Sequence, residues 1–254
     1  MNRITFIGTG NVATKLSIEL QNYGYEIVEI WSKTENSARE LSNKIGCKYT
    51  TNINDIGKTD LIIICVKDDS LLEVIENLKN NNSSMVHTSG TVGIDVFNEK
   101  ENCGVLYPLQ TFDKNININI KEIPFLIEAK NKELEMKLIK FTNVLSDSVH
   151  LINSEKRKII HLAAVFACNF TNHMLSISEK IMNDNSLDFE LLKPLILQTM
   201  EKIKTNSPKS VQTGPAKRKD FKTIIKQIDS LEDTSLKTIY ELISEHIIST
   251  QNEK

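Results

Sequence analysis

The stretch Ile4-Thr5-Phe6-Ile7-Gly8-Thr9-Gly10-Asn11-Val12-Ala13 joins an apolar, β-branched run to a glycine-rich turn. The run predicts a buried strand over residues 4–8, and the residues that follow predict a helix over 11–23. The turn between them has the pattern G-x-G-x-x-A, which is weak evidence alone but informative between a strand and a helix. We interpret it as a dinucleotide-binding turn; the alternative is a glycine turn without a ligand.

Each small residue of this turn has a physical role. Gly8 permits the tight turn, Gly10 lets the backbone approach a pyrophosphate, and Ala13 lets the helix pack closely on the sheet. The helix N-terminus adds free amides and a partial positive charge. The predicted cofactor contacts here are Gly8, Thr9, Gly10, Asn11 and Val12.

The end of the second strand predicts which cofactor binds. An acidic residue about 20 positions after the glycine turn would accept a hydrogen bond from the ribose 2′-hydroxyl of NAD. This chain has Ser32, Lys33 and Thr34 there instead. A hydroxyl beside a lysine suits the 2′-phosphate of NADP, so we expect NADP in preference to NAD. The alternative is that these residues form only the solvated start of the next helix.

Strand and helix patterns alternate through the first half of the chain, which predicts a parallel, doubly wound α/β sheet of the Rossmann type. The expected strands are 4–8, 26–31, 61–66, 85–88, 105–107 and 125–128, and the expected early helices are 11–23, 35–45 and 70–78. From residue 132 only helical patterns follow, over 132–145, 154–183, 189–204, 218–231 and 234–249. We therefore predict a cofactor-binding domain over 1–150 and an all-α substrate and dimerisation domain over 151–254.

Two further loops are expected at the carboxyl ends of strands, where such sheets bind ligands. One begins with Cys65-Val66-Lys67, and the other is Thr88-Ser89-Gly90, directly after His87. Both are predicted to contact the cofactor, and Ser89 is also a candidate for positioning the acceptor. Asp68 or Asp69 could equally serve as the cap of the helix that follows.

The helix predicted over 154–183 is apolar enough to be buried, yet polar residues share one side of it. On a helical wheel His161, Asn169, Asn172, His173 and Ser176 fall within an arc of about 120°. Buried amides and imidazoles need partners, so this polar seam predicts a cleft, a subunit contact or a purely structural network. His161 and His173 lie about 18 Å apart along a helix, so one small substrate cannot touch both.

Two other segments are candidates for the substrate site. Arg218 follows the Gly214-Pro215 turn, and we expect it to start a helix and to hold a carboxylate or phosphate, or else to pair with Asp220. Tyr107 ends a predicted strand and could line the same cleft; packing in the core is the alternative.

Composition excludes several classes of protein. The 254 residues carry 31 basic and 33 acidic side chains, a formal charge of −2, which argues against nucleic acid and anionic membranes as partners. The longest apolar run is strand-sized, and the four cysteines are widely spaced without a CxxC pair. We therefore expect no membrane span, disulfide framework or metal site, and a cytoplasmic location.

Together these segments resemble a bacterial group of Rossmann-like proteins that carry an all-helical C-terminal domain of unknown function and are described as deazaflavin-dependent NADP oxidoreductases. The resemblance rests on residues 8–13, 31–34, 87–90, 104–112, 161–173 and 213–220. More distantly the chain is similar to pyrroline-5-carboxylate reductase and the 6-phosphogluconate dehydrogenase superfamily. Those relatives imply an active site between the domains and dimerisation through the helical domain.

The chain departs from these relatives at three positions. Cys168 stands where the group tends to have asparagine, and Gln227 stands where a histidine is expected. Asn169 falls about where 6-phosphogluconate-type dehydrogenases place a lysine on the interdomain helix. The dehydrogenase mechanism therefore does not transfer directly to this chain.

The resulting hypothesis is hydride transfer between NADPH and a small carbonyl, imine or deazaflavin-type acceptor. Ser89 and Asn169 would position the acceptor, His173 or His161 would donate the proton, and Arg218 would bind an anionic group. The partners expected are a small-molecule substrate and a second copy of the chain. The alternative is a non-catalytic NADP-binding sensor or scaffold, in which the polar seam is a dimer contact.

Overall fold

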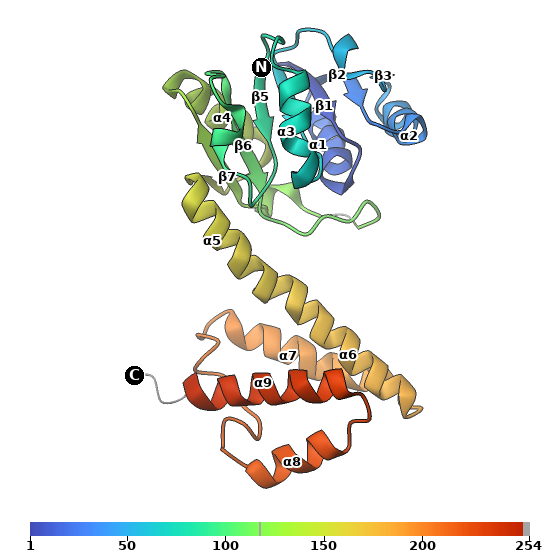
Figure 1. Ribbon diagram of the computed structural model, residues 1–254, viewed down its shortest axis with the longest axis vertical. Coiled ribbons are helices and arrows are strands. Elements are labelled where there is room, and N and C mark those ends of the chain that lie inside the picture. Colours follow the sequence, from blue (N-terminus) through green and yellow to red (C-terminus); the bar gives the residue numbers. More distant parts are fainter. Residues whose placement is uncertain (117, 251–254) are drawn as a thin grey trace. The chain divides into compact units, whose positions relative to one another are not determined.

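Eight strands form one sheet in the order β3-β2-β1-β4-β5-β6-β7-β8 (Figure 1). The computed structural model describes residues 1–116 and 118–250. The strands are β1 (Arg3–Ile7), β2 (Glu26–Trp31), β3 (Lys48–Thr50), β4 (Leu61–Ile64), β5 (Ser84–His87), β6 (Cys103–Pro108), β7 (Phe125–Ala129) and β8 (Val149–Leu151). All neighbouring strands run parallel except β6 and β7, which are antiparallel. The predicted α/β sheet is confirmed, with one antiparallel pairing added.

The strand order places a topological switch point between β1 and β4. From β1 the chain moves outward through β2 to β3, then returns to the other side of β1 as β4. Ile7 at the end of β1 pairs with Ile64 at the end of β4. The loops after these two strands therefore leave in opposite directions and open a crevice at the carboxyl edge of the sheet, the usual ligand position in such folds.

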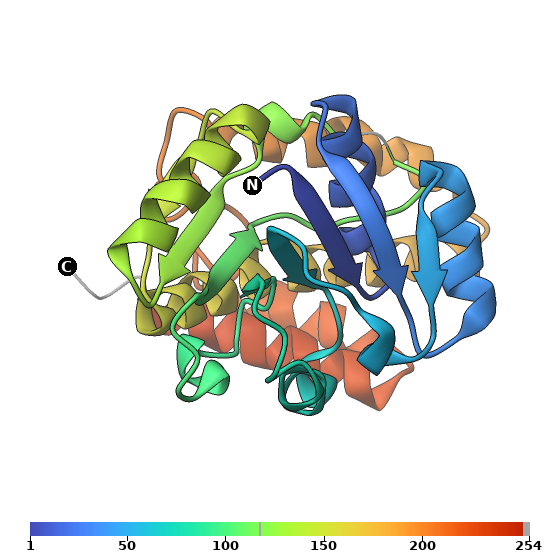
Figure 2. The ribbon, with the colours of Figure 1, turned by 90° about the horizontal axis from the view of Figure 1, so that it is seen from above.

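Apolar side chains on both faces of the central strands hold helices against the sheet. One buried cluster joins Ile4 and Phe6 to α1 (Asn11–Asn22), α2 (Glu35–Ile45) and α4 (Lys132–Leu145). The other joins Ile7 to α3 (Asp68–Asn77) and the short 3-10 helix η2 (Ile94–Phe97). Figure 2 shows these two layers on opposite sides of the sheet.

Strands β3 and β8 were not predicted. Each has three residues, and they form the two outer edges of the sheet. Neither contains a residue buried enough to belong to the core, and three residues are too few for the apolar alternation that identifies a strand in a sequence. The 3-10 helices η1 (Ile53–Asp55) and η3 (Ile120–Glu122) were likewise not predicted.

The long helix expected over 154–183 is present, but its middle is wound differently. It consists of α5 (Ser154–Ala164), the π-helical segment η4 (Val165–Phe170) and α6 (Thr171–Asp184). The expectation that this helix is buried is wrong for a single chain, because Leu162 is 59% and Phe166 63% exposed. Arg157 is the buried residue of α5, and η4 and α6 have none.

The described chain forms two compact units, Met1–Met174 and Leu175–Lys254. This division lies beyond residue 150, where the predicted domain boundary falls, and Ser154 and Arg157 bond the start of α5 to Glu128 of the sheet. The second unit contains the end of α6, then η5 (Phe189–Leu192), α7 (Lys193–Ile203), α8 (Phe221–Asp229) and α9 (Thr234–Thr250), and is the all-α region that the sequence predicts. Among the helices that the structure describes, none has the length and apolarity needed to span a membrane.

Candidate functional site

The glycine turn has the geometry that a dinucleotide requires. Gly8 adopts a φ of 110°, and a Cβ atom there would lie 2.3 Å from the carbonyl oxygen of Cys65, so only glycine fits. A Cβ at Gly10 would meet no atom of the described residues within 4 Å, which leaves open space above the turn. Gly10 caps α1, whose first turn carries no acidic side chain. These features fit a pyrophosphate at the helix N-terminus.

The predicted 2′-phosphate residues lie at the end of β2, beside the glycine turn. The Thr9 hydroxyl donates a 3.3 Å hydrogen bond to the Ser32 hydroxyl, which is buried. Thr34 is the N-cap residue of α2, and its amide contacts the Ser32 hydroxyl at 3.4 Å. Lys33 is exposed and pairs with Glu73 on α3, with Nζ and Oε2 3.0 Å apart. The structure therefore brings a carboxylate to this loop from a helix that is distant in sequence.

A pocket of about 440 Å³ opens at the carboxyl ends of β1, β4, β5 and β6. Its lining residues are Gly10, Asn11, Val12, Cys65, Val66, Lys67, Asp68, Thr88, Ser89, Gly90, Tyr107, Pro108, Gln110, Phe112 and His161. Most of the predicted cofactor residues thus surround one space, while Gly8, Thr9, Ser32, Lys33 and Thr34 lie outside its lining. Asn11 also links the glycine turn to the loop after β6 by donating a 2.7 Å bond to the Phe112 carbonyl.

Tyr107 and His161 form a polar pair in this pocket. The Tyr107 hydroxyl and His161 Nδ1 are 2.9 Å apart, and the two rings meet edge to face. Gly90 makes the contact possible, because a Cβ there would lie 2.5 Å from His161 Nδ1. Burial raises the pKa of Tyr107, with a smaller opposing effect from Arg157. The phenol is therefore protonated near neutral pH and able to donate a hydrogen bond or a proton.

The loop after β5 is held by its own hydroxyl groups. Ser89 Oγ accepts hydrogen bonds from the amides of Thr91 and Val92 at 3.1 and 3.0 Å. The Thr91 hydroxyl in turn donates to Asp68, at the start of α3. In this structure Ser89 therefore shapes the turn and is one of the residues that line the pocket.

A buried arginine fastens α5 to this loop and to the sheet. Arg157 Nη1 lies 2.6 Å from Glu128 Oε2 of β7, and Nη2 donates to the Val92 carbonyl at 2.6 Å. Ser154 Oγ donates to Glu128 and accepts from the Ile94 amide at 2.9 Å. This group was not predicted, because nothing in the sequence indicates that Arg157 and Glu128 meet. Its effect is to fix the part of α5 that carries His161.

His87 ends β5, directly before the pocket residue Thr88, and is fully buried. Its ring stacks on Phe97 with centroids 5.7 Å apart, and its Nδ1 accepts a 3.2 Å bond from the Ser89 amide. Burial, aided by Arg157, lowers its pKa to about 4. Burial also raises the pKa of the Cys65 thiol to about 12. Both groups are therefore neutral at physiological pH, which suits a structural role.

Three predicted catalytic residues do not line this pocket. Asn169 lies in the π-helical segment and His173 in α6, and both side chains are exposed. Arg218 belongs to the second compact unit. It does not start a helix as expected, because α8 begins at Phe221 with Asp220 as its N-cap. The Asp220 carboxylate is bonded to the amide and hydroxyl of Thr223.

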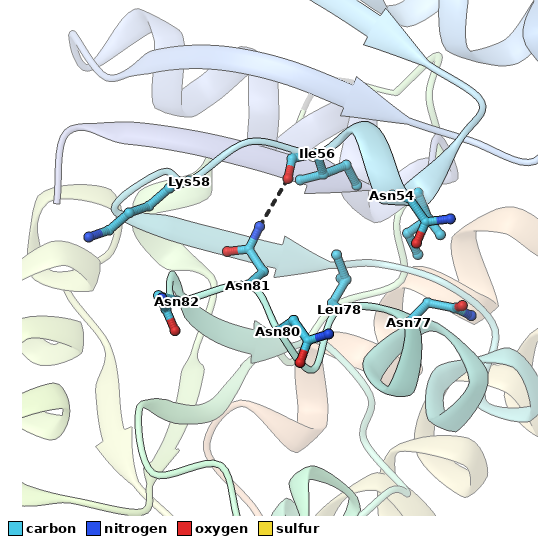
Figure 3. A pocket seen from close by; sticks show the side chains of 9 residues that line it. Asn54, Ile56, Lys58, Asn77, Leu78, Asn80, Asn81 and Asn82 are labelled. Carbon is cyan, nitrogen blue, oxygen red and sulfur yellow. Dashed lines mark hydrogen bonds between the residues drawn. The ribbon is translucent and has the colours of Figure 1, made fainter.

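A second hollow of about 420 Å³ lies among asparagine side chains near the amino ends of β4 and β5 (Figure 3). Asn81 crosses it and donates to the Ile56 carbonyl at 3.1 Å. Because ligands of doubly wound sheets bind at the carboxyl edge, we assign no function to this hollow. Within the described residues no cluster of histidine, cysteine and carboxylate side chains could hold a metal ion.

Comparisons with known proteins agree with this geometry. Residues 3–93 match the family described as coenzyme F420-dependent NADP oxidoreductase, and residues 123–247 match DUF2520, a domain of unknown function. A Bacteroides fragilis protein described provisionally as an NADP oxidoreductase is 38% identical, with a TM-score of 0.92 over 98% of each chain. No curated protein matches the chain at a significant level.

More distant structures share the fold. An imine reductase from Myxococcus stipitatus, solved with NADP⁺, is 17% identical, with a TM-score of 0.64 over 97% of this chain and 92% of that one. A 1-pyrroline-5-carboxylate reductase from Streptococcus pyogenes is 14% identical, with a TM-score of 0.63 over 97% of this chain and 98% of that one.

Proposed function

We propose that this chain, which belongs to the family of the Bacteroides fragilis NADP oxidoreductase-like protein, transfers hydride between NADPH and a small acceptor. The chain joins a coenzyme F420-dependent NADP oxidoreductase domain to a DUF2520 domain. The acceptor is a carbonyl, an imine or a deazaflavin-type ring. The observation that carries the proposal is the Tyr107–His161 pair in the pocket that begins at the glycine turn.

The N-terminal residues bind the cofactor. The amides at the start of α1 would hold the pyrophosphate, and Thr88, Ser89 and Gly90 would contact the nicotinamide half of the cofactor. Ser32 and Lys33 bind the 2′-phosphate, so NADP binds in preference to NAD. When bound, the reduced cofactor supplies the hydride; the protein supplies orientation and the proton.

The Tyr107 hydroxyl donates a proton to the acceptor's oxygen or nitrogen that takes up the electron pair as hydride reaches the acceptor's carbon. His161 stands behind it at 2.9 Å and returns a proton to the phenolate. Of the two histidines that the sequence suggests as donors, His161 is the one in the pocket. Asn169 and His173 are exposed in a single chain, and their contacts would come from another molecule.

A second copy of the chain is the partner that best explains the exposed apolar helices. In the unit that begins at Leu175, the buried residues are Ala216, Ile224 and Ser244 within the described range. Leu195 and Leu197 of α7 are 61% and 69% exposed. Because exposed apolar surface of this extent marks an interface, we propose a homodimer through the helical domain. The four cysteines are free thiols, consistent with the reducing cytoplasm.

The test is turnover by the full chain. NADPH oxidation is followed with cyclic imines, keto acids and an oxidised deazaflavin, alongside binding of NADP⁺ and NAD⁺. Turnover with one class of acceptor supports the proposal. Tight NADP⁺ binding without turnover would instead support a non-catalytic sensor or scaffold. If neither nucleotide raises the melting temperature, the cofactor site is contradicted, because a ligand above its Kd must stabilise the fold.

A further inference from the structure

The ion pair between Lys33 and Glu73 links elements from the two sides of the switch point. Lys33 belongs to the loop after β2, on one side of the switch point, and Glu73 lies in α3, which follows β4 on the other side. Their Nζ and Oε2 atoms are 3.0 Å apart. In doubly wound folds the adenosine ribose lies beside the end of the second strand. The pair therefore stands where the 2′ substituent of the cofactor has to fit.

Lys33 can exchange Glu73 for another anionic partner at little cost in stability. The side chains of Lys33 and Glu73 are 58% and 62% exposed, and exposed ion pairs contribute little to stability. The surrounding groups are more firmly placed, because Ser32 is buried and bonded to Thr9. Lys33 can thus leave Glu73 for a ligand without disturbing the fold.

We propose that Glu73 is a specificity-determining residue that favours NAD relative to NADP. This inference rests on the proposed cofactor site. Residues 31–34 contain no carboxylate that could accept a hydrogen bond from a ribose 2′-hydroxyl, and Glu73 supplies that carboxylate from α3. Lys33 holds the carboxylate in place when the 2′ substituent is a hydroxyl.

Glu73 has the opposite effect on a 2′-phosphate. It takes Lys33 as its counterion, and the Glu73 carboxylate is left unpaired beside a second anion. Repulsion between these charges lowers the affinity for NADP. The preference of this chain therefore results from two opposing residues, and removal of the carboxylate shifts it further toward NADP.

The experiment measures the Kd of NADP⁺ and NAD⁺ by calorimetry for the full-length wild type and for Glu73→Gln, Lys33→Gln and the double variant. Glu76→Gln is the matched control, because Glu76 is exposed on the same helix. In Glu73→Gln we expect NADP⁺ to bind about three- to tenfold more tightly at low salt, with a smaller gain at high salt. NAD⁺ should bind more weakly, because its 2′-hydroxyl loses the carboxylate acceptor.

The remaining variants separate local from general charge effects. Lys33→Gln should weaken NADP⁺ binding. The change in NADP⁺ affinity caused by Glu73→Gln should differ between the wild type and the Lys33→Gln variant, because contacting residues are coupled. An equal change for both nucleotides, or the same change in Glu76→Gln, would overturn the role of Glu73 while leaving the cofactor site intact. Failure of the wild type to bind either nucleotide would overturn the proposed function, and this inference with it.

Discussion

The hydroxyl of Tyr107 lies 2.9 Å from Nδ1 of His161, and the two residues come from different structural elements. Tyr107 is in β6, and His161 is in α5, which is fastened to the sheet by Arg157. The contact depends on Gly90, since any side chain there would meet the imidazole. The pair thus joins the sheet, the loop after β5 and the long helix at one point in the pocket.

If Tyr107 donates the proton, Tyr107→Phe should lower kcat about a hundredfold or more while NADPH binds as in the wild type. Steady-state NADPH oxidation with the active acceptor, together with fluorescence titration of NADPH, measures both quantities. Tyr49→Phe is the control, since Tyr49 is an exposed residue of the edge strand β3. An unchanged kcat in Tyr107→Phe, with activity lost in His161→Asn, would assign the donor to His161 instead.

Gly10→Ala should weaken NADP⁺ binding without lowering stability. A Cβ there meets no described protein atom within 4 Å, so the added methyl group obstructs only a ligand. Gly57→Ala is the matched control, since it also meets no atom within that distance. We expect an increase of about tenfold or more in Kd for Gly10→Ala alone, with similar urea midpoints for all three proteins. Equal Kd values for the wild type and Gly10→Ala would place the pyrophosphate elsewhere.

His87 should make the protein sensitive to acid. Its folded-state pKa of about 4 lies below the ordinary value of 6.5. Between these two values the unfolded chain binds the proton more readily, so the free energy of unfolding falls as pH decreases from 6.5 toward 4. The full loss is about 3 kcal/mol. His87→Asn keeps an acceptor for the Ser89 amide. In this variant the free energy of unfolding in urea should depend less on pH between 6.5 and 4. An unchanged pH dependence would show that His87 is not its cause.

Loss of Arg157 should lower the free energy of unfolding, because it leaves the largely buried Glu128 without its counterion. The two side chains are 0% and 16% exposed. Removing one partner of such a pair costs about 3–5 kcal/mol. Arg157→Met should therefore lower the free energy of unfolding by that amount, and Arg157→Met combined with Glu128→Gln should recover part of it. An effect below about 1 kcal/mol would show that the pair is not essential.

Leu195→Glu should dissociate the proposed dimer, since a symmetric interface would receive the charge twice. We expect the dimer Kd to rise at least about tenfold, measured by sedimentation equilibrium. Lys202→Glu, on the same helix α7, tests for a general charge effect. A wild type that sediments as a monomer at all concentrations would contradict the dimer.

Periodic apolar residues made most of the fold predictable. The buried run at Leu61–Ile64 and the glycine turn identify the sheet and its first crossover, because each signal lies within a few neighbouring residues. The edge strands β3 and β8, with three residues each, are too short to give such a signal. The antiparallel pairing of β6 and β7 depends on contacts between strands, which no local pattern records.

The candidate site was predictable only where it follows the ends of strands. Residues after β1, β4 and β5 meet at one edge by topology alone, so the predicted loops surround the pocket. The pairing of Tyr107 with His161, of Arg157 with Glu128 and of Lys33 with Glu73 joins residues 29 to 54 positions apart. The exposure of the helix that carries Asn169 and His173 was not predictable, because its sequence is as apolar as that of a buried helix.

A crystal structure of the full chain with NADP⁺ would show whether the cofactor reaches the Tyr107–His161 pair. The pyrophosphate should lie over Gly10, with C4 of the nicotinamide about 7 Å or less from the Tyr107 hydroxyl, since one acceptor bond has to fit between them. NADP⁺ bound away from the glycine turn, or a nicotinamide directed away from the Tyr107–His161 pair, would contradict the account.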